Sequence, residues 1–388
     1  MAITKRAARR RPIVLVYQRR RPEPVDDDGM SKPSSGDVDD GGAASSTAAL
    51  SDRVDGGRDP KRLRVISSLP VCIGGRYKVL AQLGSGSFGD VYRAKDTRSG
   101  NVVAVKCLRR ENDDPDGRYL QRELAGEVRA LEACRGDPHV VQIVDYGGHP
   151  DAKTWPEAPF IVMEYVGASL QDAILRSGGS PSARRYAECE VRPIMRQLLS
   201  GVKRMNEAGF MHRDIKPDNV LVDEHGNVKI CDLGFARTKA GSPPPFSNPV
   251  AALLYRAPEV LLESTTYDET VDTWALGCLM ALLLAGNPLF YGKTEVEMLR
   301  AILDVLGMDD LTRWRGYANC MIKKSKMRFV RRDSRLREMF PIPGMIGGGG
   351  RRPELSPAGF EVLKGLLSCN PERRMTAAEA LEQRWFES

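Results

Sequence analysis

The stretch LGSGSFGDVYRAKDTRSGNVVAVKCL, residues 83–108, decides the fold. Its glycines Gly84, Gly86 and Gly89 have the spacing G-x-G-x-x-G, which lets a backbone approach phosphate groups closely. In a dinucleotide-binding fold a helix follows these glycines directly. Here two segments rich in β-forming residues follow instead, joined by the turn sequence TRSGN. The glycines are therefore predicted to lie in a β-hairpin. Taken alone the motif is weak, and a plain glycine turn is its alternative.

The patterns that follow predict a small antiparallel sheet carrying one helix. A helical pattern runs over residues 119–134, with leucine and valine recurring on one face. Strand-like runs return at HVVQIVDYG and FIVMEYV, residues 139–147 and 160–166. After Gly167 helical patterns dominate. They cover residues 187–209, 269–286, 295–307, 356–369 and 376–386.

The composition is that of a globular protein. The chain has 388 residues, of which 41% are hydrophobic, enough for two or three domains. No run of about 18 apolar residues occurs, and the longest, residues 275–286, is predicted to be a buried helix. The eight cysteines are scattered without a C-x-x-C pair, so neither a zinc site nor a disulfide framework is indicated. Reduced thiols predict a location in the nucleus and/or cytoplasm.

The first 76 residues are predicted to be a disordered extension. The formal net charge of +7 is uneven, because residues 1–21 are basic and carry no acidic residue. Residues 22–70 are rich in Asp, Gly, Ser and Ala and cannot bury enough apolar surface to fold. The basic block and PKRLR, residues 60–64, are either solvated or act as import signals that bind importin. Nucleic-acid binding by the tail is a weaker alternative. The apolar IVLVY segment, residues 13–17, is too short for a signal peptide.

Lys106 gives the glycine loop its chemical context. It follows VAV on the second strand of the hairpin, which returns it beneath the glycines. A strand lysine at this place holds the α- and β-phosphates of a nucleotide. The alternating Val103 and Val105 disfavour an ordinary surface lysine. Glu127 on the predicted helix is the best candidate to pair with Lys106, and Glu123 is the second.

Two downstream motifs supply the groups that phosphoryl transfer needs. HRDIKPDN, residues 212–219, contains Asp214, which can accept the proton of a substrate hydroxyl, and Lys216, which can neutralise a γ-phosphate. Asn219 in this motif and Asp232 in the following DLG provide oxygen ligands for Mg²⁺. Each residue type is common alone, but the set in this order is not expected by chance.

From about Tyr77 to Phe386 the chain resembles a eukaryotic protein kinase of the serine/threonine type. The motifs above carry the resemblance, together with YRAPE, VDTWALGC and NPERRMTAAEAL further along the chain. It implies that Glu259 pairs with Arg374 in the large lobe and that Asp272 braces the catalytic loop.

The resemblance implies an α+β fold with two lobes. Residues 77–166 would form a small antiparallel β-sheet lobe with one main helix. Residues 167–388 would form a larger, mainly helical lobe, with a flexible insertion around residues 341–355 that contains four glycines in a row.

The segment NPLFYGKTEVEMLRAILDVLG, residues 287–307, is similar to the corresponding part of cyclin-dependent kinases. A fainter similarity points to the plant F-type branch, which phosphorylates other cyclin-dependent kinases. The resemblance implies transfer of the ATP γ-phosphate to serine or threonine with Mg²⁺, in cell-cycle or transcription-linked signalling. Arg256 and the VAALLYR segment resemble those of proline-directed kinases, which implies protein substrates with Ser-Pro or Thr-Pro sites.

The resemblance also implies an ATP site between the lobes. Met163 would be the gatekeeper, and Glu164 and Val166 would bond adenine through their backbones. The residues predicted to surround ATP are Leu83, Gly84, Ser85, Gly86, Ser87, Phe88, Gly89, Asp90, Val91, Ala104, Lys106, Glu127, Met163, Glu164 and Val166.

The predicted helix and activation segment depart from the family pattern. The cyclin-binding helix of the family reads P-S-T-A-I-R-E, whereas QRELAGE, residues 121–127, shares only the final Glu, which weakens the case for a cyclin partner. Gly126 replaces an arginine of the activating phosphate's clamp, and glycine inside a helix costs about 1 kcal/mol relative to alanine. Ser247 stands in place of the activating threonine, with Arg213 and Arg237 left to clamp its phosphate.

Ala252 and the tip of the glycine loop depart as well. Ala252 stands where a threonine usually bonds the catalytic aspartate and lysine, which predicts slowed but real catalysis. The alternative is a pseudokinase, a scaffold that binds nucleotide or partners with little catalysis. Ser87 and Phe88 occupy the place of an inhibitory Thr-Tyr pair. Ser87 is a candidate for phosphorylation, whereas Phe88 has no hydroxyl to modify.

Overall fold

The computed structural model describes residues 72–86, 89–109, 118–148, 158–176, 185–238, 253–264, 267–323, 333–344 and 353–387, all within one compact unit. The predictions for the extension, for Ser87, Phe88, Ser247 and Ala252, and for the glycine run of the insertion lie outside these residues. The first described strand begins at Cys72, slightly before Tyr77, at which the sequence predicts the folded part to start.

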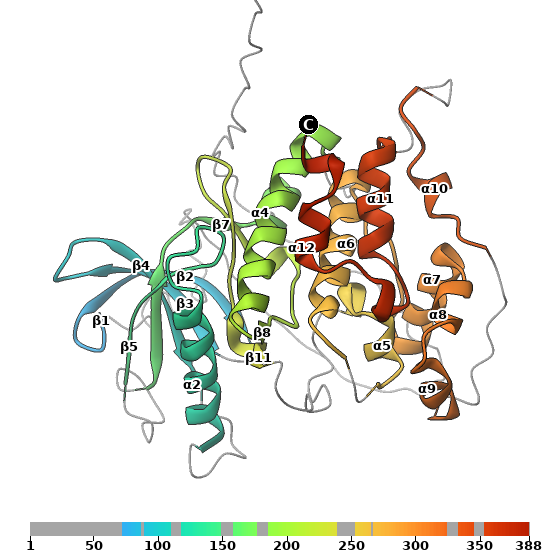
Figure 1. Cartoon of the computed structure of the whole chain (residues 1–388). Coiled ribbons are helices and arrows are strands. Elements are labelled where there is room, and N and C mark those ends of the chain that lie inside the picture. Colours follow the sequence, from blue (N-terminus) through green and yellow to red (C-terminus); the bar gives the residue numbers. More distant parts are fainter. Residues whose placement is uncertain are drawn as a thin grey trace, which may run out of the picture. The chain divides into compact units, whose positions relative to one another are not determined.

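A six-stranded antiparallel sheet forms the small lobe (Figure 1). In spatial order its strands are β1 (Cys72–Ile73), β2 (Tyr77–Gly86), β3 (Gly89–Asp96), β4 (Val102–Leu108), β6 (Phe160–Glu164) and β5 (Ile143–Gly147). The pairing of β2 with β3 ends at Gly86 opposite Gly89, which confirms the predicted hairpin.

Gly89 shows why the hairpin requires its last glycine. Its φ of 138° lies in a region that side-chain-bearing residues rarely adopt. A Cβ atom there would collide with the carbonyl oxygen of Cys107 on the neighbouring strand β4. The fold itself therefore demands a glycine at this position, whatever the loop binds.

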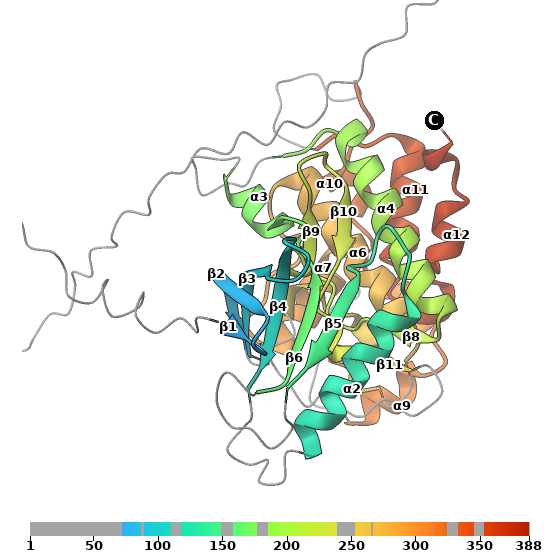
Figure 2. The same ribbon diagram turned by 90° about the vertical axis from the view of Figure 1, so that its left-hand side faces the viewer.

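Helix α2 (Arg118–Ala133) is the one main helix of the small lobe, within a residue of its predicted bounds. Leu120 and Leu131 are buried, and Leu124 and Val128 pack against the core, so the apolar face points inward as its periodicity predicts. Figure 2 shows α2 running beside β5.

The chain after α2 connects the two lobes through backbone hydrogen bonds. The amide of Val141 donates to the carbonyl of Ile230 at 2.9 Å, and the amide of Ile230 donates to His139 at 2.8 Å. Ile230 ends strand β10 (Val228–Ile230) of the large lobe. The segment that follows α2 is therefore anchored to the large lobe just before the DLG motif.

The large lobe consists of helices packed around α6. They are α3 (Leu170–Arg176), α4 (Glu188–Glu207), α5 (Pro258–Leu261), α6 (Thr270–Ala285), α7 (Glu295–Leu306), α8 (Asp309–Thr312), α9 (Tyr317–Lys323), α10 (Leu336–Met339), α11 (Pro357–Leu366) and α12 (Ala377–Leu381). α6 is buried along nearly its whole length, as predicted, and ends at Gly286 with φ 74°. No helix in the described ranges is long and apolar enough to cross a membrane.

Short strands hold the two catalytic motifs side by side. β8 (Phe210–Met211) leads into the HRDIKPDN motif and pairs with β11 (Arg237–Thr238), which follows the DLG motif. β9 (Val220–Val222) and β10 form the hairpin that joins the motifs, and β7 (Ala168–Ser169) pairs with β9. The hairpin and the β8–β11 pair therefore keep the HRDIKPDN and DLG motifs next to one another.

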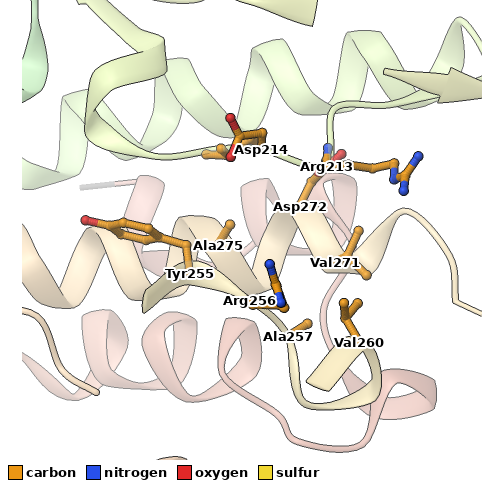
Figure 3. A pocket seen from close by; sticks show the side chains of 10 residues that line it. Arg213, Asp214, Tyr255, Arg256, Ala257, Val260, Val271, Asp272 and Ala275 are labelled. Carbon is orange, nitrogen blue, oxygen red and sulfur yellow. Dashed lines mark hydrogen bonds between the residues drawn. The ribbon is translucent and has the colours of Figure 1, made fainter. Parts of the chain in front are cut away.

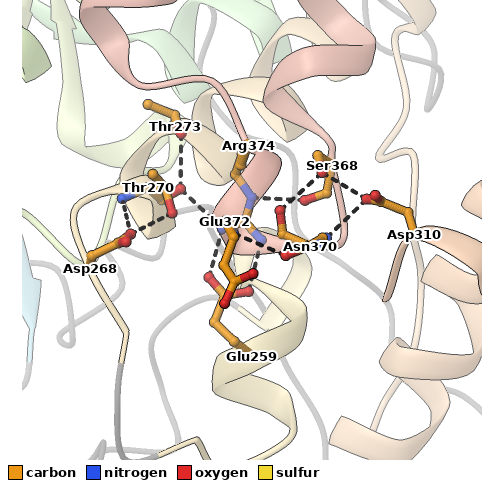
Figure 4. Close-up of polar contacts among 9 residues, drawn as sticks. All are labelled: Glu259, Asp268, Thr270, Thr273, Asp310, Ser368, Asn370, Glu372 and Arg374. Atoms are coloured by element: carbon orange, nitrogen blue, oxygen red, sulfur yellow. Dashed lines mark hydrogen bonds and ion pairs between the residues drawn. The ribbon is translucent and has the colours of Figure 1, made fainter. Parts of the chain in front are cut away.

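A buried ion pair fastens the chain around α6 (Figure 4). The guanidinium of Arg374 donates two hydrogen bonds to Glu259, at 2.6 and 2.8 Å, and both side chains are fully buried. Arg374 also donates to the carbonyls of Thr270 and Ser368. The pairing of Glu259 with Arg374 that the resemblance implies is confirmed.

Candidate active site

Lys106 lies at the centre of a buried charge cluster. It sits on β4 between β3 and β6. Its Nζ lies 2.8 and 2.7 Å from the two carboxylate oxygens of Glu127, and 2.7 Å from Oδ1 of Asp232. Burial lowers the pKa of Lys106, but the carboxylates of Asp232 and Glu127 outweigh this effect and raise the pKa above its ordinary value. Lys106 therefore carries a fixed positive charge beneath the glycine loop.

The structure decides between the two glutamates that the sequence predicted as possible partners of Lys106. Glu127 is the partner, and its side chain is only 2% exposed. Glu123, one helical turn earlier, forms an ion pair with Arg237 at 3.0 Å instead. Burial raises the pKa of Glu127, Lys106 opposes this effect, and the negative charge of Asp232, which shares the ammonium of Lys106, adds to it.

Asp232 owes its position to an unusual backbone conformation. It follows β10 and has φ 62°, a left-handed conformation that costs a non-glycine residue roughly 1–2 kcal/mol. Burial would raise its pKa, but the charge and hydrogen bond of Lys106 outweigh burial and lower the pKa. The Asp232 carboxylate is therefore ionised and suited to bind a cation.

Asp272 of α6 holds the catalytic loop in place through two hydrogen bonds. The backbone amides of His212 and Arg213 each donate to a carboxylate oxygen of Asp272 at 2.7 Å. Burial raises the pKa of Asp272, and these two hydrogen bonds oppose that effect. Arg213 has φ 71°, so the brace holds the loop in a conformation that it would otherwise avoid. The role that the resemblance implies for Asp272 is confirmed.

Asp214 is fixed by four hydrogen bonds. Its Oδ2 accepts from Lys216 Nζ at 2.6 Å and from Asn219 Nδ2 at 2.9 Å. Asn219 Nδ2 also donates to the carbonyl of Asp214 at 2.8 Å, and the Asp214 amide donates to Nδ1 of His212 at 3.2 Å. The carboxylate is 3% exposed and can accept a proton from a hydroxyl group placed beside it.

Asn219 and Asp232 are chemically suited to hold magnesium. Asn219 uses its amide nitrogen on Asp214, which leaves its Oδ1 oxygen as the donor to a metal. The described residues contain no group of three or more His, Cys, Asp or Glu side chains placed to hold a metal ion. Magnesium commonly takes one or two protein oxygens and completes its shell with substrate phosphates and water. The two side chains fit that pattern.

The predicted adenine site lies along β4 and β6. Ala104 and Met163 are directly opposite one another in these strands, and Val166 follows β6. The Glu164 side chain does not point to a nucleotide: its Oε1 accepts from Lys229 at 2.6 Å and from the Gln142 amide at 2.9 Å. The backbone roles of Glu164 and Val166 stay predictions.

The described part of the glycine loop is spread over two strands. Leu83, Gly84, Ser85 and Gly86 end β2, and Gly89, Asp90 and Val91 begin β3. The carboxylate of Asp90 accepts from Arg109 at 2.8 Å. Burial would raise the pKa of Asp90, but hydrogen bonds from Ser85 and Arg109 lower it. The contacts of these residues with ATP stay predictions.

The two arginines predicted to clamp a phosphate lie close enough to influence one another. Burial lowers the pKa of Arg213, and the charge of Arg237 adds to that lowering while Tyr267 opposes it. The Arg213 guanidinium lies 5.8 Å from the ring centre of Tyr267. Arg237 pairs with Glu123, which the sequence did not anticipate.

A pocket lies between the catalytic loop, the YRAPE segment and α6 (Figure 3). It is lined by Arg213, Asp214, Ile215, Tyr255, Arg256, Ala257, Val260, Val271, Asp272 and Ala275. Arg256 is 8% exposed, and its Nη1 donates to Glu295 of α7 at 2.6 Å. Its side chain is therefore held in place at one wall of the pocket.

Sequence reasoning missed two ion pairs at the edge of the site. Glu123 and Arg237 are 114 residues apart, and Glu164 and Lys229 are 65 residues apart. No spacing rule connects residues so distant. The only sequence signal was that Glu123 shares a helix face with Glu127, because residues four apart are neighbours on a helix.

Comparisons with known proteins agree with this geometry. The protein kinase domain family matches residues 77–386. The chain is 43% identical to "Putative cyclin-dependent kinase F-2" of Oryza sativa subsp. japonica, over 80% of this chain and 90% of that protein. It is 37% identical to cyclin-dependent kinase G-2 of Oryza sativa subsp. indica, over 80% of this chain and 41% of that protein. It is 32% identical to cell division control protein 2 homolog 1 of Trypanosoma brucei brucei, over 81% of this chain and 99% of that protein.

Proposed function

This chain belongs to the protein kinase family, as a serine/threonine kinase of the cyclin-dependent type, and we propose that it is an active catalyst that phosphorylates Ser-Pro and Thr-Pro sites in other proteins. The observation that carries activity is Asp214, buried and held by Lys216 and Asn219. A module that only bound nucleotide would have no use for a carboxylate fixed in this way.

The proposed reaction is a direct transfer of the γ-phosphoryl group from ATP. Asp214 orients the substrate hydroxyl and accepts its proton while the hydroxyl oxygen bonds to the γ-phosphorus. The bond between the γ-phosphorus and its bridging oxygen breaks, and ADP leaves. Lys106 holds the α- and β-phosphates, and Lys216 neutralises charge on the transferred group. Magnesium, held by Asn219 and Asp232, would supply further charge neutralisation.

The preference for proline after the phosphorylated residue rests on the segment that contains Arg256. VAALLYR, residues 250–256, resembles the same segment in proline-directed kinases. Its described end, Leu253–Tyr255, forms a short 3-10 helix directly before Arg256, which the ion pair to Glu295 fixes. A substrate backbone beside Asp214 would run past this rigid segment.

We further propose that phosphorylation of Ser247 raises activity. A phosphate brings close to two negative charges, and Arg213 and Arg237, which lie close enough to influence one another, are the cations that would bind it. Measured on phosphorylated enzyme, Ser247→Ala should lower kcat. Unchanged activity of this variant would contradict the clamp.

The proposed partners are protein substrates in cell-cycle or transcription-linked signalling, with other cyclin-dependent kinases and the RNA polymerase II tail as candidates. The names of the relatives make a cyclin the first binding partner to test, although in QRELAGE only Glu127 matches the family's cyclin-binding helix. The basic clusters of the extension would bind importin, and the proposed location is the nucleus and/or cytoplasm.

One assay tests the proposed function. Purified protein is incubated with Mg-ATP and a library of Ser-Pro, Thr-Pro, Ser-Ala and Thr-Ala peptides, with and without candidate cyclins, beside the Asp214→Asn variant. Wild type should phosphorylate the proline-containing peptides and the variant should not. Equal signals from the two proteins would identify a pseudokinase, and equal signals from proline and alanine peptides would remove the proposed specificity.

A further inference from the structure

A second ion pair connects α2 to the segment after Asp232. Arg237 Nη2 lies 3.0 and 3.2 Å from the two carboxylate oxygens of Glu123. The Glu123 side chain is 10% exposed and that of Arg237 is 31% exposed, so the pair is shielded from water more than an ordinary surface pair. Glu123 lies one helical turn before Glu127, the residue that holds Lys106.

The other end of Arg237 bonds the backbone of the same segment. Nη1 donates to the carbonyl of Ala236 at 2.9 Å and to that of Gly234 at 3.4 Å. One guanidinium thus joins the Glu123 carboxylate of α2 to two carbonyls that lie two and four residues after Asp232. Since Asp232 and Glu127 both contact Lys106, the position of α2 relative to this segment decides whether the Lys106 cluster can form.

Helix α2 has reason to need such a connection. Gly126 lies between the two glutamates, and a Cβ atom there would meet no other atom within 4 Å. No close packing therefore requires the glycine, which weakens the helix by about 1 kcal/mol relative to alanine. Gln121, Arg122 and Ala125 on the same stretch are exposed, so its apolar anchoring comes from Leu120 and Leu124 on the inner face.

The charges of the two glutamates give Arg237 a second role. Burial raises the pKa of Glu127, and the negative charge of Glu123 adds to this effect. Like charges one turn apart on a helix destabilise it. Arg237 supplies the opposite charge beside Glu123, which lets both carboxylates remain on the same face of α2.

We propose that Glu123 is a positioning residue for phosphoryl transfer: through Arg237 it fixes α2 against the segment after Asp232, so that Glu127 keeps hold of Lys106. The proposal rests on the proposed kinase activity. A bound phosphate or a second chain bound to α2 could also order this helix. In the proposal, the Glu123 side chain supplies part of that ordering.

The test compares Glu123→Gln with Glu132→Gln. Glu132 is the matched control, because it lies on the same helix and forms a local ion pair at 2.6 Å with Arg135, three residues further along the chain. Glu123→Gln should lower kcat/KM for ATP about tenfold, which corresponds to about 1.4 kcal/mol. The KM for peptide should stay within about twofold and Tm within about 2 °C. Glu132→Gln should leave all three quantities unchanged, and Glu123→Asp, which keeps the charge, should recover most of the activity.

A double-mutant cycle checks that Glu123 acts through Arg237. In a Ser247→Ala background, which removes the proposed phosphate from the comparison, Arg237→Gln should cause the same loss as Glu123→Gln, and the double variant should be no worse than either. The proposal would be overturned if the losses of kcat/KM in the two single variants multiplied in the double variant. It would also be overturned if kcat/KM of Glu123→Gln stayed within about twofold of wild type.

Hydrogen exchange gives a readout that does not depend on activity. Amides of residues 119–133 should exchange about tenfold faster in Glu123→Gln than in Glu132→Gln. Equal exchange in the two variants would overturn the proposal even if the chain proved inactive. If wild type and Asp214→Asn had the same kinase activity while exchange in α2 still depended on Glu123, only the proposed activity would be rejected.

Discussion

The catalytic loop and helix α2 are held in place by different kinds of contact. The loop is bonded through its own backbone to Asp272, a residue of the buried helix α6. α2 packs its apolar face against the core, and ion pairs of its side chains with Lys106 and Arg237, which belong to other segments, hold it at the site. The Asp272 carboxylate is buried in α6, so we expect the brace on the loop to break only when α6 is disturbed, whereas the ion pairs of α2 can break without unfolding either segment.

This difference separates chemistry from control. Asp214, Lys216 and Asn219 are in place whenever the large lobe is folded. Glu127 reaches Lys106 only while α2 is held against the segment that follows Asp232. A kinase built in this way can be regulated by moving one helix, without remaking its catalytic loop.

The largest expected effect comes from the fixed region. Replacing Asp214 by Ala removes the group that accepts the substrate proton, and we expect kcat to fall about 10²–10⁴-fold. Because the brace from the loop to Asp272 uses the amides of His212 and Arg213 and not the Asp214 side chain, thermal unfolding should change little. A loss of activity that merely follows a loss of folded protein would contradict the distinction between chemistry and scaffold.

Breaking the buried ion pair between Arg374 and Glu259 in the large lobe should lower the stability of the protein. Arg374→Ala leaves Glu259 buried without its partner, and we expect the free energy of unfolding to fall by about 3–5 kcal/mol. Denaturant unfolding measures this, with Arg335→Ala as control, since Arg335 pairs with Glu338 on the exposed surface. Similar losses in the two variants would show that the large lobe is not anchored at Arg374.

Ala252→Thr should strengthen the fixed region. A threonine there could bond Asp214 and Lys216, and such a bond is worth roughly 1–3 kcal/mol. If all of it acts on the transition state, kcat would rise about 5–150-fold. Steady-state kinetics with a Ser-Pro peptide measures the gain. An unchanged kcat would mean that the four hydrogen bonds on Asp214 already suffice.

The smallest effect is expected at the ion pair between Glu164, the last residue of β6, and Lys229 of β10. Lys229→Met removes the 2.6 Å ion pair with Glu164, whose side chains are 18% and 31% exposed. Partly exposed pairs contribute about 1 kcal/mol or less, so KM for ATP should change by no more than about fivefold. Lys203→Met, which breaks the exposed pair with Glu207 on α4, is the control. A larger change at Lys229 would show that this ion pair also controls nucleotide binding.

Local patterns in the sequence predicted most of the fold and of the catalytic centre. The hairpin, α2 and α6 follow from residue spacing over one element, and Gly86, Gly89 and Gly286 mark their ends. Asp214 and Asp232 were found because each belongs to a short motif. Such features depend on neighbours in sequence, which a single chain displays directly.

The choice of ion-pair partners could not be predicted in the same way. Glu123 and Glu127 share one face of α2, so the helical period cannot say which of them meets Lys106. The answer depends on how α2 is rotated against the large lobe, and on Arg237, which is 114 residues away from Glu123. That rotation is decided by tertiary packing.

Hydrogen exchange on the wild-type chain, with and without Mg-ADP, tests the central distinction most directly. The amides of His212 and Arg213, bonded to buried Asp272, should exchange only with global unfolding and should not respond to nucleotide. The amides of residues 119–133 in α2 should exchange faster and become protected when Mg-ADP binds. Equal protection of the two regions, with no response of α2 to nucleotide, would contradict the account of a fixed catalytic loop and a movable α2.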